Sequence, residues 1–158
     1  MDMSHEKQAD NAIEGPNDLH KELDLIQAVI SRMAHNSFLI KGWAMTLISA
    51  LIAFGKDLIL GKDSGITYMV MMIGIIFPFW WLDAYYLKQE RAFRKLYDNA
   101  ITYPNAISRT RFALNPKVYL KEVGNTWKNM GRDAIIWFYI PIIIIVLVGI
   151  VARLTGVM

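Results

Sequence analysis

A few polar side chains of this 158-residue chain have the types and spacings found in reactive sites. His20 and Asp24 are four residues apart, so on a helix they would share one face and could contact the same metal ion. Two ligands without a third make a weak site, and we therefore expect no metal and no other cofactor. Arg32 and His35 lie one turn apart beside Asn36, a pairing suited to acid-base chemistry on a phosphodiester. Their position just before an apolar run favours ordinary polar residues at a membrane surface.

Three charged residues lie at the edges of apolar runs, namely Lys41, Asp83 and Asp133. A charge at the edge of a membrane span is a candidate site, because burying it in hydrocarbon is costly. The favoured interpretation is that the Lys41 side chain extends to the lipid headgroups. The alternative is an ion pair between Lys41 and either Asp83 or Asp133.

The composition of the chain favours a membrane protein. Apolar residues make up 54% of the chain, charged residues only 20%, and the mean hydropathy is +0.28. These values are too apolar for one ordinary soluble domain. The chain has no cysteine, which excludes disulfides, thiolate metal sites and cysteine nucleophiles.

The elements that must position these residues are three apolar runs, at residues 38–55, 65–82 and 134–152. At a rise of about 1.5 Å per residue, each run spans roughly 27–29 Å as a helix, close to the hydrocarbon thickness of a bilayer. The sequence therefore predicts an all-α integral membrane protein with three transmembrane helices.

The distribution of basic residues predicts the orientation. Residues 83–133 contain ten of the seventeen Lys and Arg residues and carry a local charge of +5, whereas residues 1–37 carry −4. The ten are Lys88, Arg91, Arg94, Lys95, Arg109, Arg111, Lys117, Lys121, Lys128 and Arg132. Because basic segments between spans stay in the cytoplasm, residues 83–133 and the N-terminus should be cytoplasmic and the C-terminus outside. The tryptophans near the same ends of the spans, Trp43, Trp80, Trp81 and Trp137, agree with this orientation.

Residues 1–16 are predicted to be a disordered lead-in, and residues 17–37 an amphipathic cytoplasmic helix that runs into the first span. Apolar residues recur there at spacings of three and four, which indicates a helical seam. The seam residues are Leu19, Leu23, Ile26, Ile30 and Met33. The seam packs either on the protein's own cytoplasmic helices or on a helix of another subunit, and the sequence leaves both open.

Residues 83–133 are predicted to be a basic cytoplasmic helical segment. The second span should continue as one helix until Tyr103-Pro104 ends it. A loop over 105–114 and one short helix from Asn115 to about Met130 should follow. The cytoplasmic basic face comprises Arg91, Arg94, Lys95, Arg109 and Arg111. Anionic lipid headgroups account for these charges better than nucleic acid does.

Two prolines, Pro78 and Pro141, lie within the second and third spans at nearly the same expected depth. They are either tolerated kinks or a functional hinge or widening.

Two sequence motifs resemble those of small bacterial inner-membrane proteins of unassigned activity: NSFLIKGW at 36–43 and LDAYYLKQERAFRKLYD at 82–98. The overall layout also resembles SLATT-type effectors and RipA-like oligomeric membrane proteins. That resemblance implies a location in the bacterial inner membrane, homo-oligomers, and a role in anti-phage defence through membrane damage.

The function expected from these features is a non-enzymatic, oligomeric inner-membrane protein that perturbs the membrane or forms a pore in it. The alternative is a scaffold that recruits a cytoplasmic partner through residues 83–133. An enzyme ranks third, because no convergent set of reactive groups is visible.

Overall fold

The computed structural model describes residues 16–60, 64–104 and 112–155, and within these ranges the chain is all-helical. The elements are α2 (Pro16–Leu60), α3 (Gly65–Thr102), α4 (Lys117–Leu120), α5 (Thr126–Met130) and α6 (Asp133–Leu154). The predicted all-α class is confirmed. The expected disordered lead-in lies outside the described residues, apart from Pro16, which begins α2.

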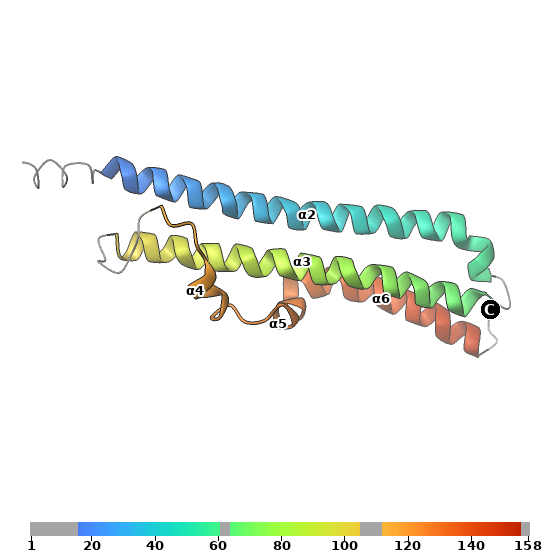
Figure 1. Cartoon of the computed structure of the whole chain (residues 1–158). Helices are drawn as coiled ribbons and strands as arrows, with labels where there is room; N and C mark the ends of the chain where they lie inside the picture. The colour runs from blue at the N-terminus through green and yellow to red at the C-terminus, as the bar shows by residue number, and fades with distance from the viewer. Residues whose placement is uncertain (1–15, 61–63, 105–111, 156–158) are drawn as a thin grey trace, which may run out of the picture.

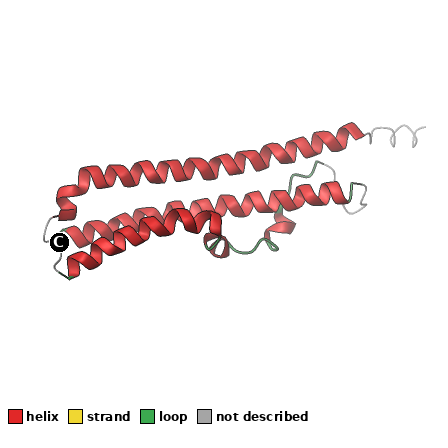
Figure 2. Ribbon diagram, turned by 180° about the vertical axis from the view of Figure 1, so that it is seen from behind, coloured by secondary structure: helices red, strands yellow, loops and turns green. Residues whose placement is uncertain are grey.

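The central element is α3. The helix α2 runs antiparallel along the whole of α3, and α6 lies beside only the first half of α3 (Figure 1). The view from behind shows the same arrangement (Figure 2). The segment that contains the short helices α4 and α5 returns along α3 (Figure 2). Every long helix therefore packs on α3.

Helices α2 and α3 are much longer than a bilayer requires. They contain 45 and 38 residues, or roughly 68 and 57 Å, against a hydrocarbon core of about 30 Å. Three helices of the described chain, α2, α3 and α6, are long and apolar enough to cross a membrane. The prediction of three apolar helices of spanning length is thus confirmed.

The end of α3 follows the prediction from proline. The helix continues past Asp83 without a break and stops at Thr102, because Tyr103 precedes Pro104 and leaves the α region, with φ −130° and ψ 64°. The second apolar run and the charged residues after it therefore form a single rigid element.

The expected single helix from Asn115 to Met130 is wrong. The structure has two short helices, α4 and α5, separated by Gly124, whose φ is +85°. Asn125 follows with extended backbone, and α5 starts at the next residue. A glycine in the left-handed region ends a helix at little steric cost, and here it turns the chain so that α5 packs on α3.

Two separate cores stabilise the molecule. Ile26 and Ile30 of α2 pack on Phe93, Leu96 and Ala100 of α3. We call the antiparallel pair of helix segments 16–37 of α2 and 83–102 of α3 the stalk. The second core joins α2, α3, α5 and α6 beside the apolar halves of the long helices, and it consists of Ala44, Ile48, Met72, Ile76, Ala84, Met130, Ile135 and Tyr139.

The stalk core settles where the seam of α2 packs in this chain. Ile26 and Ile30 are buried against α3, while Leu19, Leu23 and Met33 are half-buried. Of the two interpretations of the seam, packing on the protein's own helix accounts for this burial. The centre of the seam is therefore covered without a second subunit.

The register between α3 and α6 places the two prolines at one level. Trp80 stacks on Tyr139 with ring centroids 6.0 Å apart, and a Cβ on Gly149 would lie 3.3 Å from the Met69 side chain. The same antiparallel register sets Pro78 opposite Pro141. Both are inside their helices and exposed.

Candidate functional site

All five tryptophans of the chain lie near one level of the helix bundle. Trp81 follows Trp80, which stacks on Tyr139, and Trp137 precedes Tyr139 by two residues. Trp127 of α5 contacts Phe77 of α3, with ring centroids 6.0 Å apart. Trp43 is two residues from Lys41, which pairs with Asp83. We call this level the tryptophan belt, and such a belt is typical of a membrane-water interface.

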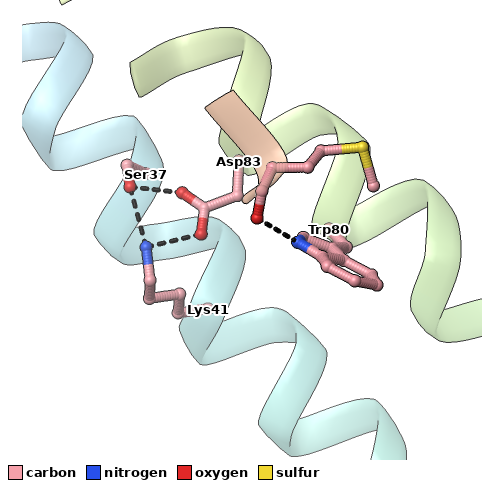
Figure 3. Close-up of polar contacts among 5 residues, drawn as sticks. Ser37, Lys41, Trp80 and Asp83 are labelled. Carbon is pink, nitrogen blue, oxygen red and sulfur yellow. Dashed lines mark hydrogen bonds and ion pairs between the residues drawn. The ribbon is translucent and has the colours of Figure 1, made fainter. Parts of the chain in front are cut away.

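A polar cluster joins α2 to α3 at this level. The Lys41 Nζ atom lies 2.5 Å from Asp83 Oδ2 and donates a 3.0 Å hydrogen bond to Ser37 Oγ. Ser37 in turn donates to Asp83 Oδ1. The three side chains converge from the two helices, with Trp80 one turn away on α3 (Figure 3).

The third long helix reaches the same carboxylate. Tyr139 of α6 is fully buried, and its hydroxyl lies beside the Asp83 carboxylate. Trp80 donates a 3.2 Å hydrogen bond to the Met130 carbonyl, which fixes α5 to α3 at this level. All three long apolar helices therefore meet around Asp83, and we call Ser37, Lys41, Asp83 and Tyr139 the junction.

The junction has the chemistry of a clamp. A serine beside a lysine suggests a nucleophile and its base, but Ser37 donates its proton to Asp83 while Lys41 donates to Ser37 Oγ, so the lysine is not placed to accept the serine proton. Ser37 also sits in the interior of α2, where the neighbouring backbone N–H groups are bonded within the helix and are not free to stabilise an oxyanion. The arrangement instead neutralises a buried charge between helices.

The structure differs from the favoured interpretation of Lys41. Its side chain is only 23% exposed and is directed to Asp83, which is completely buried, so the ion pair replaces extension to the headgroups. The reason is that an unpaired carboxylate in the interior costs more free energy than the partial desolvation of a lysine near the surface. Asp133 does not take part, since it is exposed at the start of α6.

The other sequence candidates stay apart from the junction. His20, Asp24, Arg32 and His35 are all exposed on the stalk, and Asn36 is half-buried. Among the described residues, no group of three or more His, Asp or Glu side chains is placed to hold a metal ion.

The basic face is only partly described. Arg91 is half-buried, while Arg94 and Lys95 are exposed. Arg94 pairs with Glu90 at 2.7 Å, and Lys95 pairs with Glu122 at 2.6 Å. Arg109 and Arg111 lie outside the described residues. The pair formed by Lys95 ties the turn after α4 to the stalk.

A second buried acid lies at the end of the stalk far from the belt. Glu22 is 2% exposed, and its Oε1 atom accepts a 3.1 Å hydrogen bond from the Phe112 backbone N–H. Phe112 has a φ of +59°, in the left-handed region that residues other than glycine rarely adopt. Glu22 therefore helps to hold a strained backbone that presents a half-exposed phenyl ring.

Several apolar side chains are exposed around this far end. The described ones on α3, α4 and the segment between them are Ile101, Tyr103, Phe112, Leu114 and Val118. We call these five the end group. Large apolar side chains outside a membrane are usual at sites of protein contact.

Sequence reasoning missed several of the residues that the structure brings together. Neither Ser37 nor Tyr139 is among the residues predicted from the sequence. Ser37 lies four residues after Met33, the last residue of the seam, and four residues before Lys41, and this spacing was the available signal. Glu22, four residues before Ile26, was the matching signal on the stalk. No feature of the sequence indicated the left-handed backbone conformation of Phe112.

The fold and the belt define a class: an all-helical chain compatible with a multi-pass membrane protein. Comparison of the chain with protein-family models, with curated proteins and with solved structures gave no significant match.

Proposed function

We propose that this protein is a multi-pass anchor in the cytoplasmic membrane whose stalk holds a protein partner on the cytoplasmic side. The observation that carries the proposal is that α2 and α3 do not end at the tryptophan belt. They continue together for roughly 26 Å, from Asp83 to Ala100, with a core of their own. A membrane span alone needs no such extension.

The charge distribution supports the cytoplasmic side. The stalk and the segment that returns along it contain most of the basic residues of the chain, and Arg94, Lys95, Lys117 and Lys121 are exposed there. Basic residues near span ends favour retention in the cytoplasm.

The end group supports a protein partner. Its apolar side chains lie beyond the belt, where lipid does not cover them, and Phe112 is displayed at the cost of backbone strain. Strained residues kept in place by a buried partner often mark functional sites. Lys117 and Lys121 add exposed positive charge nearby, so the partner we propose presents an apolar surface with acidic side chains around it.

A membrane-perturbing oligomer, which the architectural resemblance implies, has less support. Its expected assembly surface was the seam of α2, and the centre of that seam is packed against α3 of the same chain.

Phe112→Gly tests the docking role without disturbing the fold. Glycine adopts the left-handed conformation freely, so the variant should be as stable as the wild type or slightly more stable, while the phenyl ring is lost. A photoreactive phenylalanine at position 112 or 118 should give one discrete adduct with another protein, and the same group at exposed Leu25 should not.

The purified partner should then bind the wild-type chain in detergent and lose at least about tenfold in affinity for Phe112→Gly, because central aromatic contacts dominate interfaces. Adducts at all three positions alike, or undiminished binding by Phe112→Gly at unchanged melting temperature, would contradict the proposal.

A further inference from the structure

The short helix α5 lies at the level of the tryptophan belt and is held there by several contacts. Trp80 donates to the Met130 carbonyl at 3.2 Å, and Phe77 contacts the Trp127 ring. Asn129 is completely buried and donates from Nδ2 to the Val123 and Asn125 carbonyls, at 3.3 and 3.0 Å. Five residues are too few for a stable isolated helix, so this placement is imposed by α3.

The side chains that α5 and the following turn leave outside are those of a headgroup-binding surface. Trp127 is 65% exposed, and Lys128 and Arg132 are exposed as well. Within the described part of the chain, neither cation forms an ion pair. Lys128 directly follows Trp127, and Arg132 lies five residues further along the chain than Trp127. An exposed indole with exposed cations close to it in the sequence matches an interface where rings lie among headgroups and cations contact phosphates.

We propose that Trp127, Lys128 and Arg132 form a binding site for anionic phospholipid headgroups. The indole lies between the headgroups, beside Phe77, and the two cations contact the lipid phosphate. The inference rests on the membrane placement in the proposed function, but it does not depend on the partner at the end group. In this inference the basic side chains nearest the bilayer bind lipid. Lys117 and Lys121, on α4 and after it, remain available to the protein partner.

The chain offers a matched control on α4 and the turn after it. Lys117 and Lys121 are exposed cations of the same returning segment, but the pair of Lys95 with Glu122 places this region about twelve residues beyond Asp83 on α3, or roughly 18 Å. That distance is about twice the screening length at physiological salt, which is about 8 Å. The double variant Lys117→Gln/Lys121→Gln therefore removes the same charge from outside the headgroup layer.

The test is native mass spectrometry of the full chain in detergent, titrated with phosphatidylglycerol or with phosphatidylcholine. The wild-type chain should retain phosphatidylglycerol in preference. Lys128→Gln/Arg132→Gln should weaken that binding roughly tenfold or more, because each basic side chain near the surface contributes roughly a fivefold factor. Lys117→Gln/Lys121→Gln should change it less than about twofold.

Other outcomes would overturn the inference. Equal losses in the two double variants would assign the binding to net charge, and equal retention of the two lipids would remove the site. Inorganic phosphate that displaces the lipid at comparable concentration would assign the cations to a free anion. Extraction of the chain from membranes by alkaline carbonate would instead contradict the membrane placement, which separates that failure from the failure of the lipid site.

Discussion

Lys41→Met should lower the free energy of unfolding by about 3 to 5 kcal/mol, the largest effect we expect from a single substitution at the junction. The variant leaves the Asp83 carboxylate completely buried and without its cation. Asp83→Asn should cost less, about 1 to 2 kcal/mol, because the Lys41 side chain is already 23% exposed and can turn toward the headgroups.

The double variant Lys41→Met/Asp83→Asn should be more stable than Lys41→Met alone, since removing both charges leaves none buried without a partner. The measurement is a denaturant titration in detergent micelles followed by far-ultraviolet circular dichroism. Lys95→Met is the matched control. It breaks the ion pair of Lys95 with Glu122, which has a similar length of 2.6 Å. Because these two side chains are 46% and 53% exposed, the free energy of unfolding should fall by less than about 1 kcal/mol. Equally small losses for Lys41→Met and Lys95→Met would show that Lys41 does not clamp the helices.

Ile26→Ala should cost about 2 to 5 kcal/mol, because the side chain is fully buried in the stalk core. Its neighbour Leu25 is 46% exposed, so Leu25→Ala should cost less than about 1 kcal/mol. The same titration measures both values. A larger loss for Ile26→Ala than for Leu25→Ala would locate the stabilising contact on the face of α2 that packs against α3.

The particle mass in detergent separates the two interpretations of the seam. If Ile26 packs within the chain, neither variant changes the mass of the particle. A lower mass for Ile26→Ala at unchanged stability would place the seam between subunits and would restore the oligomeric interpretation.

Much of the fold could be predicted because its signals are local. Apolar runs report spanning helices directly, and Pro104 fixes the end of α3 through the residue before it. The break between α4 and α5 was not predicted, because a glycine within a polar stretch does not reveal whether its φ will be positive. The positive φ of Gly124 goes with the packing of α5 against α3, which the contacts of Trp80 and Phe77 maintain.

The junction was harder to predict than the helices. Lys41 and Asp83 are 42 positions apart in the sequence, and Tyr139 lies on a third helix, so their meeting depends on the register of α2 and α6 on α3. A one-turn shift of either helix would have separated them. The sequence shows that charges lie at the ends of spans, but it does not show which charges face one another.

The prolines illustrate the same limit. Their equal depth followed from counting along antiparallel helices, and the contacts of Trp80 with Tyr139 and of Met69 near Gly149 give the same register. Their common level was predictable because it depends on residue counts alone, whereas the exposure of both prolines depends on how α3 and α6 pack.

We propose that three helices cross the membrane and that the stalk extends into the cytoplasm. The chain has no cysteine, so single cysteines introduced at exposed Lys117 and Thr155 report the two sides without interference. A membrane-impermeant maleimide added to intact cells should label Thr155→Cys at once and Lys117→Cys only after permeabilisation. Labelling of Lys117→Cys in intact cells, or of both positions alike, would contradict the account.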